Sequence, residues 1–446
     1  MVTRLSEYDA ARRSPPEPSG AYIRPPFKWD DSAARVDLAL LFCALFLQRF
    51  SLPFGGTFLM LDLVPVVFIL VYQFFSGKLV VQYDRLLWFL GVVLAASCSL
   101  LLNFSSMMLT SYLLFLVLYS LVTLIRPSTP DRYNRTLHAF QLLVLILSCI
   151  GVVQFLAQFV VDGKQLLRFY GLVPDLLFGY FNAGAVNTIH PLSAGSAILK
   201  SNGLFLTEPS TFSQITALGI LVEVLEFRRP RYLLGMTLGF LVAYSGTGLI
   251  PLLLIPLAGL RHSRAGLSAL LVLMLPLALF ATGIIDPSVF LGRVGEFQDT
   301  GASGFDRFVA PVLLAAKQFD NASLLLLLVG NGPGTAKNLN GAAFYSAFAP
   351  TWFKLFIEYG IIGSFIFVCF LASCLRQSKC PGLVLAAMIV NYIFNVDFLT
   401  TSILTIMIVL GTLNSGEAKR IRGDSVTVYR AGRSVWPLVS RASSRA

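Results

Sequence analysis

The sequence predicts an all-α polytopic membrane protein. Of the 446 residues, 56% are hydrophobic and only 13% are charged, a balance far more apolar than that of soluble domains. The apolar stretches are long and continuous, whereas the strands of a transmembrane barrel alternate in polarity over about ten residues. The net charge of +11 lies mostly in short loops and tails, where it sets membrane topology rather than binding nucleic acid.

Continuous apolar runs give the predicted spans, because about 20 residues cross a bilayer. Ten such runs are present: 36–53, 56–76, 85–103, 107–125, 136–162, 204–227, 265–285, 352–375, 381–396 and 398–414. A further run, 232–260, is too long for one helix and is interrupted by Ser245-Gly246-Thr247-Gly248, so we expect it to cross twice. The prediction is therefore about 12 transmembrane helices within residues 36–414.

Positive charge orients these spans. With this number of crossings every cluster of Lys and Arg lies in the cytoplasm, as the positive-inside rule requires. The clusters include Lys78 with Arg85, and Arg126 with Arg132 and Arg135. The polar residues 1–35 are then a disordered cytoplasmic tail rather than a signal peptide, and residues 415–446 are a basic cytoplasmic tail. Two long loops, 163–203 and 286–351, share the outer face, and the segment 308–330 is expected to be an amphipathic helix on that surface.

The first outer loop carries Arg168, which is followed by Tyr170 and, after a gap of about ten residues, by Gly179. His190 lies further along the same loop. One interpretation of Arg168 is an anchor at the level of the lipid headgroups. The other is a cation that binds substrate, and the arginines of the second loop favour it.

The span predicted at 204–227 has a polar outer end. Glu208 precedes Pro209, a residue that the first turn of a helix tolerates. A carboxylate near membrane depth normally faces the interior of a bundle or water. Glu208 also suits the positive end of a helix dipole, and the two interpretations are compatible. Of the other charges at the outer ends of spans, Arg49 and Asp62 are expected to pair.

The second outer loop supplies two more cations, Arg293 and Arg307, on either side of the flexible segment 300–304. Guanidinium groups bind phosphate through two hydrogen bonds and do not lose their charge. Arg168, Arg293 and Arg307 together therefore suit a diphosphate.

A glycine-rich turn, Gly330-Asn331-Gly332-Pro333-Gly334, follows in the same loop. Either its N–H groups face an anion or it is a plain turn before a helix. It lacks the Lys-Ser/Thr pair of a nucleotide-binding loop. The sequence also lacks an Asp-x-Asp pair and a His-Glu-x-x-His motif, so we expect no metal ion and no cofactor.

In these motifs the chain resembles the bacterial O-antigen and exopolysaccharide polymerases of the Wzy type, within the superfamily that includes the O-antigen ligases. The likeness extends over residues 36–414. It is carried by Phe205-Leu206-Thr207-Glu208-Pro209-Ser210, the broken segment 245–248, residues 303–307, the turn at 330–334, and residues 353–363 with Glu358-Tyr359-Gly360. The spacing of Arg168 and Gly179 is similar to that of an arginine–glycine motif in the outer loops of polymerases.

The resemblance implies a metal-independent glycosyltransferase, built as a GT-C-like helical bundle in the bacterial inner membrane with its active site facing the periplasm. Its substrate is an oligosaccharide linked to undecaprenyl diphosphate. The enzyme transfers the growing glycan onto the incoming lipid-linked unit, which lengthens a surface polysaccharide or exopolysaccharide. The partners implied are membrane lipid, a chain-length regulator and a flippase, and not nucleic acid.

By matching position, the resemblance implies that Arg168 contacts the donor diphosphate or its sugar, and that Arg293 and Arg307 contact the diphosphate. The base that accepts the proton of the attacking hydroxyl is left open, and the candidates are Glu208, His190 and Asp306. The catalytic set is Arg168, Glu208, Arg293, Arg307 and His190. The substrate-binding set is Tyr170, Gly179, Ser303, Asp306, Asn331, Gly332 and Tyr359.

One departure bears on the choice within the superfamily. The ligases carry a catalytic histidine in the second long loop, whereas His138, His190 and His262 all lie outside residues 286–351. This favours a polymerase, although His190 can act from the first loop. The alternatives are an O-antigen ligase-type glycan transferase and a lipid-linked oligosaccharide transporter or flippase. The transporter is disfavoured because the sequence shows one broken helix and no matching second half.

Overall fold

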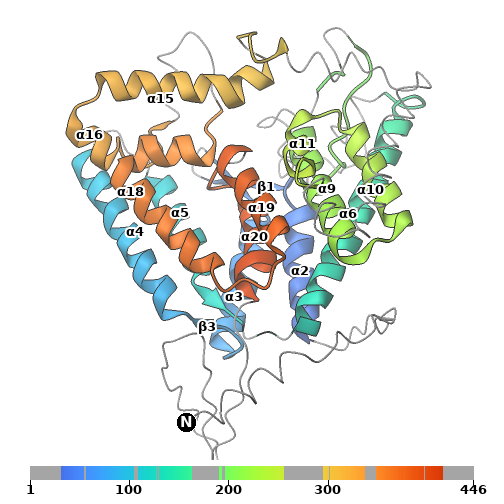
Figure 1. The fold of residues 1–446 in the computed structure, drawn as a ribbon, viewed down its shortest axis with the longest axis horizontal. Helices are drawn as coiled ribbons and strands as arrows, with labels where there is room; N and C mark the ends of the chain where they lie inside the picture. Colours follow the sequence, from blue (N-terminus) through green and yellow to red (C-terminus); the bar gives the residue numbers. More distant parts are fainter. Residues whose placement is uncertain are drawn as a thin grey trace, which may run out of the picture. The chain divides into compact units, whose positions relative to one another are not determined.

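The computed structural model describes residues 32–54, 57–104, 109–126, 128, 130–162, 190–192, 196–255, 295–300, 302–336, 348–395 and 397–414. The chain divides into Met1–Ser32 and a second unit, Ala33–Ala446, to which the architecture described below belongs. The described part is mainly helical, with two short pairs of strands (Figure 1).

The N-terminal elements are α2 (Ser32–Phe46), β1 (Ser51–Phe54), β2 (Thr57–Met60), α3 (Leu63–Phe75), β3 (Val80–Val81), α4 (Tyr83–Leu102), α5 (Leu109–Val122), β4 (Leu124–Ile125) and α6 (Pro130–Ala157). Strands β1 and β2 pair antiparallel with Ser51 opposite Met60, and β3 pairs antiparallel with β4. The later helices are α9 (Pro209–Val222), α10 (Pro230–Val242), α11 (Leu249–Leu252), α15 (Ala310–Asn321), α16 (Leu324–Val329), α18 (Thr351–Leu375), α19 (Gly382–Asn395) and α20 (Thr401–Met407).

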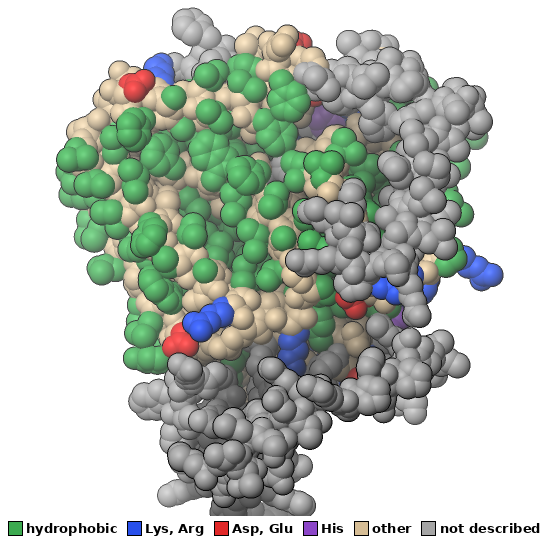
Figure 2. Space-filling model, viewed as in Figure 1, with side chains coloured by type: hydrophobic (Ala, Val, Ile, Leu, Met, Phe, Trp, Pro, Cys, Tyr) green, Lys and Arg blue, Asp and Glu red, His purple; other side chains and the backbone are tan. Residues whose placement is uncertain are grey.

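Several of these helices are suited to a membrane. Four are long and apolar enough to cross one: Tyr83–Leu102, Asp131–Ala157, Pro209–Phe227 and Thr351–Leu375. Shorter apolar helices accompany them in the described chain: Leu63–Phe75, Leu109–Val122, Gly382–Phe394 and Thr401–Leu413. Figure 2 shows hydrophobic side chains over much of the face on the side of α4, with charged side chains near its upper and lower margins. The protein is therefore a membrane-embedded helical protein.

The described helices do not reach the predicted 12 spans, and the apolar run 265–285 lies outside the described residues. The runs 36–53 and 56–76 were expected to be two full spans. In the structure α2 already ends at Phe46 and α3 begins only at Leu63, and the β1–β2 hairpin occupies the chain between them. The run 232–260 is interrupted after α10, and α11 is only a short helix beyond the break at 245–248.

Helix α9 begins later than its apolar run. The predicted span starts at residue 204, but Gly203 and Leu204 have left-handed backbones, with φ of 69° and 68°. A right-handed helix cannot contain such residues. The chain remains non-helical until Glu208, whose extended backbone is followed by Pro209 in the first turn of α9.

Two arginines that were used to predict topology are buried. The Arg85 guanidinium donates to four backbone carbonyls at 2.8 to 3.4 Å, those of Val122, Leu124, Cys374 and Thr412. Arg126 lies 2.5 Å from the carboxylate of Asp37, which also accepts from the Thr136 hydroxyl. Carbonyls at the ends of helices lack partners within the helix, so Arg85 satisfies several of them at once.

Helix α18 is the element on which the second half of the bundle packs. It lies against α4, α16 and α19, while α9 packs against α6 and α10. Gly360, with φ of 65° and ψ of −169°, breaks α18, and Figure 1 shows its two pieces running in different directions. A small apolar cluster that includes Phe305, Leu314 and Phe353 joins the first piece to α15.

Candidate functional site

The structure brings the second loop onto the start of α9. Arg307 lies in a π-helical turn, Phe305–Val309, which runs directly into α15. Its Nη2 atom is 2.6 Å from Oε2 of Glu208. The Arg307 side chain is 10% exposed and that of Glu208 is 28% exposed, so this ion pair lies at the edge of the interior rather than in open solvent.

One hydroxyl side chain contacts this ion pair, and two more are linked to it through hydrogen bonds. The Ser210 hydroxyl donates to Glu208 Oε2 at 2.6 Å and accepts from Arg307 Nη2 at 3.3 Å. Thr247 donates to the carbonyl of Ser210 at 3.3 Å, and its own hydroxyl is 3.1 Å from that of Ser245. The Glu208-Pro209-Ser210 motif, the break at 245–248 and Arg307 therefore form one site.

Gly248 allows the break at 245–248 to approach α9 closely. A Cβ atom at this position would lie 2.5 Å from the carbonyl oxygen of Ser213. Glycine is therefore required for this contact, which brings Thr247 to α9.

Arg307 is also held from its other side. Its guanidinium carbon lies 4.7 Å from the centre of the Phe348 ring, a cation–π contact. The backbone N–H of Phe348 donates to the carbonyl of Asp306 at 2.9 Å. The two ends of this part of the second loop thus meet at Arg307. Asp306 has a backbone role here, and Ser303 is exposed on the same loop.

Electrostatics keep Glu208 ionised. Burial by itself would raise the pKa of the Glu208 carboxyl. The charge of Arg307, the hydrogen bonds from Ser210 and Arg307, and the charge of His190 together lower this pKa below its ordinary value. A carboxylate whose pKa is lowered is a weak base, which disfavours Glu208 as the residue that accepts a proton.

His190 belongs to the neighbourhood of this site. Its carbonyl accepts from the N–H of Lys200 at 2.8 Å, and Pro191 and Leu199 form a bridge beside it. This pairing holds the end of the first loop against the segment that leads to Glu208. Of the predicted catalytic residues, the structure therefore puts Glu208 and Arg307 in contact and His190 within electrostatic range of Glu208. Arg168, Tyr170, Gly179 and Arg293 lie outside the described residues.

The arrangement leaves cationic donors available. Among the described residues, both hydrogen bonds of the Arg307 guanidinium use Nη2. A guanidinium has five N–H donors in a rigid fork, so the remaining donors can bind an anion. Glu208 and Phe348 meanwhile fix the orientation of the group.

The glycine-rich turn has a structural role. The N–H of Asn331 donates to the carbonyl of Ile357 at 2.8 Å, and that of Gly332 donates to the carbonyl of Glu358 at 3.1 Å. These groups satisfy carbonyls at the break in α18, so they do not face an anion. Tyr359, predicted to bind substrate, is 3% exposed and packs in the apolar core. Asn331, Gly332 and Tyr359 are thus assigned to the break in α18 rather than to the site.

The expected pair of Arg49 and Asp62 is not formed. The Arg49 guanidinium donates to the carbonyl of Leu204 at 2.9 Å. Both carboxyl oxygens of Asp62 are buried and have no hydrogen-bond partner among the described residues. Burial raises the pKa of Asp62 to about 7. Adjacency of two helix ends predicted this pair, but the intervening hairpin directs Arg49 toward the turn before α9.

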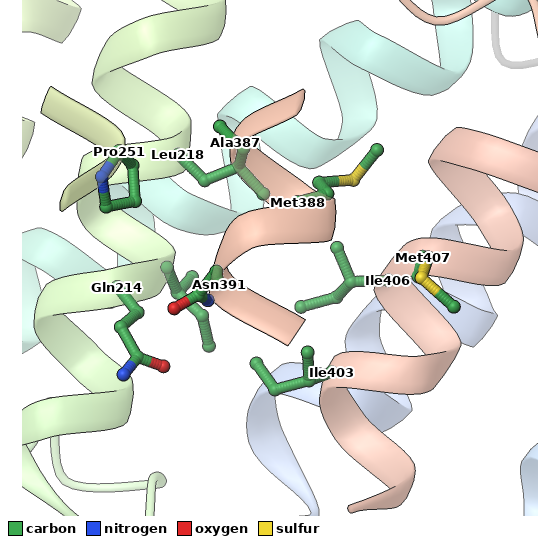
Figure 3. Close-up of a pocket in the computed structure, with 10 residues that line it drawn as sticks. Gln214, Leu218, Pro251, Ala387, Met388, Asn391, Ile403, Ile406 and Met407 are labelled. Atoms are coloured by element: carbon green, nitrogen blue, oxygen red, sulfur yellow. The ribbon is translucent and has the colours of Figure 1, made fainter. Parts of the chain in front are cut away.

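A pocket lies next to the site within the bundle. Residues of α9, α11, α19 and α20 line it, and most of its wall is apolar. Gln214 on α9, one turn beyond Ser210, and Asn391 on α19 place their amides on the same side of this pocket (Figure 3). Sequence reasoning missed this pocket because Gln214 and Asn391 are far apart in the chain and belong to no motif.

No protein-family model matches the sequence, and the search of curated proteins found no match to it.

Proposed function

We propose that this protein is a metal-independent glycosyltransferase of the bacterial inner membrane, which polymerises oligosaccharide units linked to undecaprenyl diphosphate. It transfers the growing glycan onto the incoming lipid-linked unit. The observation that supports this proposal best is the meeting of Arg307 with Glu208 and Ser210, three residues of the motifs on which the resemblance rests.

The chemistry of that cluster suits a departing diphosphate. When a glycan leaves its lipid carrier, negative charge develops on the diphosphate, and a fixed cation at that point lowers the barrier. Arg307 is held in advance by Glu208 and Phe348, so little reorganisation is needed when the charge appears. In this proposal Arg168 and Arg293 supply further positive charge from the two loops.

The substrate would be amphiphilic, with a charged diphosphate and an apolar prenyl chain. The polar cluster at the start of α9 is followed, one turn along the same helix, by side chains that line a small and largely apolar pocket.

His190 is the proposed proton acceptor. An imidazole titrates near pH 6.5, close to the pH at which an extracytoplasmic enzyme works. Glu208, by contrast, is an ionised carboxylate committed to Arg307. A carboxylate in electrostatic range of the histidine would stabilise the imidazolium that forms when the acceptor hydroxyl loses its proton.

The proposed topology has 12 spans in a GT-C-like bundle, with loops 163–203 and 286–351 on the periplasmic face and both tails in the cytoplasm. The positive-inside distribution of Lys and Arg supports it. A chain-length regulator and a flippase are the proposed protein partners.

The length of lipid-linked glycan in cells tests the proposal. Arg168→Ala, Arg293→Ala and Arg307→Ala should each shorten the chains. Lys317→Ala removes an exposed cation of the same loop and should leave chain length unchanged. Persistence of long chains in all three arginine variants would contradict the assignment.

The position of His190 favours one alternative, a ligase-type transferase. Ligases of the superfamily use a histidine, and here His190 lies in electrostatic range of Glu208. Supplying purified protein with a lipid A core acceptor separates the two activities. Transfer to that acceptor without chain growth would select the ligase.

A further inference from the structure

A second group of charged side chains is buried near the break in α18, and no role in the transfer reaction has been given to it. Lys354 and Glu358 lie on the first piece of α18, and Asp397 lies between α19 and α20. The side chain of Lys354 is 2% exposed and Glu358 is fully buried, whereas Asp397 is 32% exposed.

Lys354 and Asp397 form a closed ion pair. The ammonium Nζ donates to both carboxylate oxygens of Asp397, at 3.0 and 3.1 Å. It also lies 4.9 Å from the centre of the Phe398 ring. Asp397 accepts in addition from the N–H of Leu399 at 2.9 Å. The single positive charge is therefore matched by Asp397.

Glu358 has no such partner. Both of its carboxyl oxygens are buried, and neither makes a hydrogen bond with a described residue. The backbone amides of Gly334 and Ala336 lie near the carboxyl and favour its charged form, but neither meets the distance and angle of a hydrogen bond to a carboxyl oxygen. Lys354 is one turn away on the same helix, but Asp397 occupies it. An unpaired carboxylate is strongly disfavoured in such a place, and the usual response is to bind a proton.

We propose that Lys354, Glu358 and Asp397 form a proton-binding site, in which Glu358 is a protonated carboxyl and Asp397 is the ionised partner of Lys354. The proton resides on a carboxyl oxygen of Glu358 and exchanges with water, and the partly exposed Asp397 is the end of the group that solvent reaches. This inference is independent of the proposed glycan transfer.

A metal cation does not fit this group. The Asp397 oxygens that would bind it already accept from an ammonium group, whose charge would repel a second cation. Among the described residues, the other titratable groups in electrostatic range are the phenols of Tyr119, Tyr359 and Tyr392, from α5, α18 and α19. Phenols are neutral at physiological pH, so they do not compensate a charge on Glu358.

The proton has a structural consequence. The carbonyl of Glu358 accepts from the Ser99 hydroxyl at 2.6 Å and from the N–H of Gly332 at 3.1 Å, so this residue joins α18 to α4 and to the turn at 330–334. Deprotonation would place a charge beside the amides of Gly334 and Ala336 and draw them toward the carboxyl. High pH should therefore disturb the contact between the turn and the break in α18.

Infrared difference spectroscopy of the purified full-length protein at neutral pH tests the proposal. Glu358→Gln should remove a carbonyl stretching band of a protonated carboxyl. Glu208→Gln is the matched control and should remove bands of an ionised carboxylate instead. Loss of carboxylate bands in the Glu358→Gln spectrum would overturn the proposal.

The folding of the same variant is a second readout. Because glutamine has nearly the shape of a protonated glutamic acid, Glu358→Gln should fold with an unchanged melting temperature at neutral pH. Its melting temperature should also fall less than that of the wild type as the pH rises. Failure of Glu358→Gln to fold would show that the ionised form is required, and would equally overturn the proposal.

Discussion

Arg307 Nη2 lies 2.6 Å from Glu208 Oε2, although 99 residues separate them in the chain. This contact connects the loop that precedes α15 to the first turn of α9.

The ion pair between Glu208 and Arg307 should contribute measurably to the stability of the folded protein. A double-mutant cycle of Glu208→Gln and Arg307→Gln, measured by unfolding in detergent, should give a coupling energy of about 1–2 kcal/mol, since the pair is partly exposed. Additive effects would contradict the ion pair.

The same ion pair predicts that the stability of the folded protein decreases in acid. The pKa of Glu208 is lowered in the folded protein, so its contribution to stability is present above the pKa of an unfolded glutamate, about 4.3. That contribution is lost as the pH falls below this value. The melting temperature of the wild type should therefore fall more steeply in acid than that of Glu208→Gln.

Asp62 predicts the opposite effect, a stability that decreases as the pH rises. Its pKa is raised to about 7, so the folded state binds a proton that the unfolded state releases near pH 4. Stability should decline as the pH rises from about 4 to about 7, by up to about 1.4 kcal/mol per pH unit. Asp62→Asn should remove this decline, whereas Asp320→Asn, at an exposed position on α15, should not. Equal pH profiles for wild type and Asp62→Asn would rule out the assignment.

Gly360 predicts a strict requirement for glycine. Its φ is 65°, and a Cβ there would lie 2.5 Å from the carbonyl oxygen of Leu328. Gly360→Ala should lower the free energy of unfolding by about 1–3 kcal/mol or more, because strain and a backbone clash act together. Gly382→Ala is the control, since a Cβ there meets nothing within 4 Å. Similar melting temperatures for the two variants would show that the break in α18 is not as described.

The contacts of Arg85 predict that lysine cannot replace arginine at this position. Lysine keeps the charge but cannot donate to four carbonyls in the planar arrangement that the guanidinium makes. Arg85→Lys should therefore reduce the yield of folded protein and lower its melting temperature. Arg376→Lys, at an exposed position after α18, should leave both unchanged. Matching behaviour of the two variants would mean that Arg85 acts only through its charge.

Composition was sufficient to predict a helical membrane protein, because apolar length is a local property of the sequence. The apolar runs are longer than the helices that form within them, so the predicted helix ends were wrong by several residues. The left-handed backbone of Leu204 is held by Gln154 and Asn202, whose side-chain oxygens both accept from its N–H at 3.1 Å. Gln154 is 50 residues away in the chain, and no local sequence pattern predicts such a contact.

Part of the site was also predictable. Glu208 was chosen as a carboxylate at the polar end of a predicted span and Arg307 as a cation of the second long loop, and the structure brings them together. Asn331 and Gly332 were chosen from a glycine pattern, but their N–H groups serve the carbonyls of α18. Glycine-rich turns that bind an anion and those that approach another backbone look alike in sequence. Lys354 was missed because its partner Asp397 belongs to a different pair of helices.

In the proposed reaction Arg307 is the preorganised cation that receives a lipid-linked diphosphate. Binding of a polyprenyl diphosphate to the purified protein tests it most directly, with Arg307→Gln compared against Lys317→Gln. Arg307→Gln should weaken binding by roughly 10- to 100-fold, the value of one charge-assisted contact, and Lys317→Gln should bind as the wild type does. Equal affinity in Arg307→Gln and the wild type would contradict it.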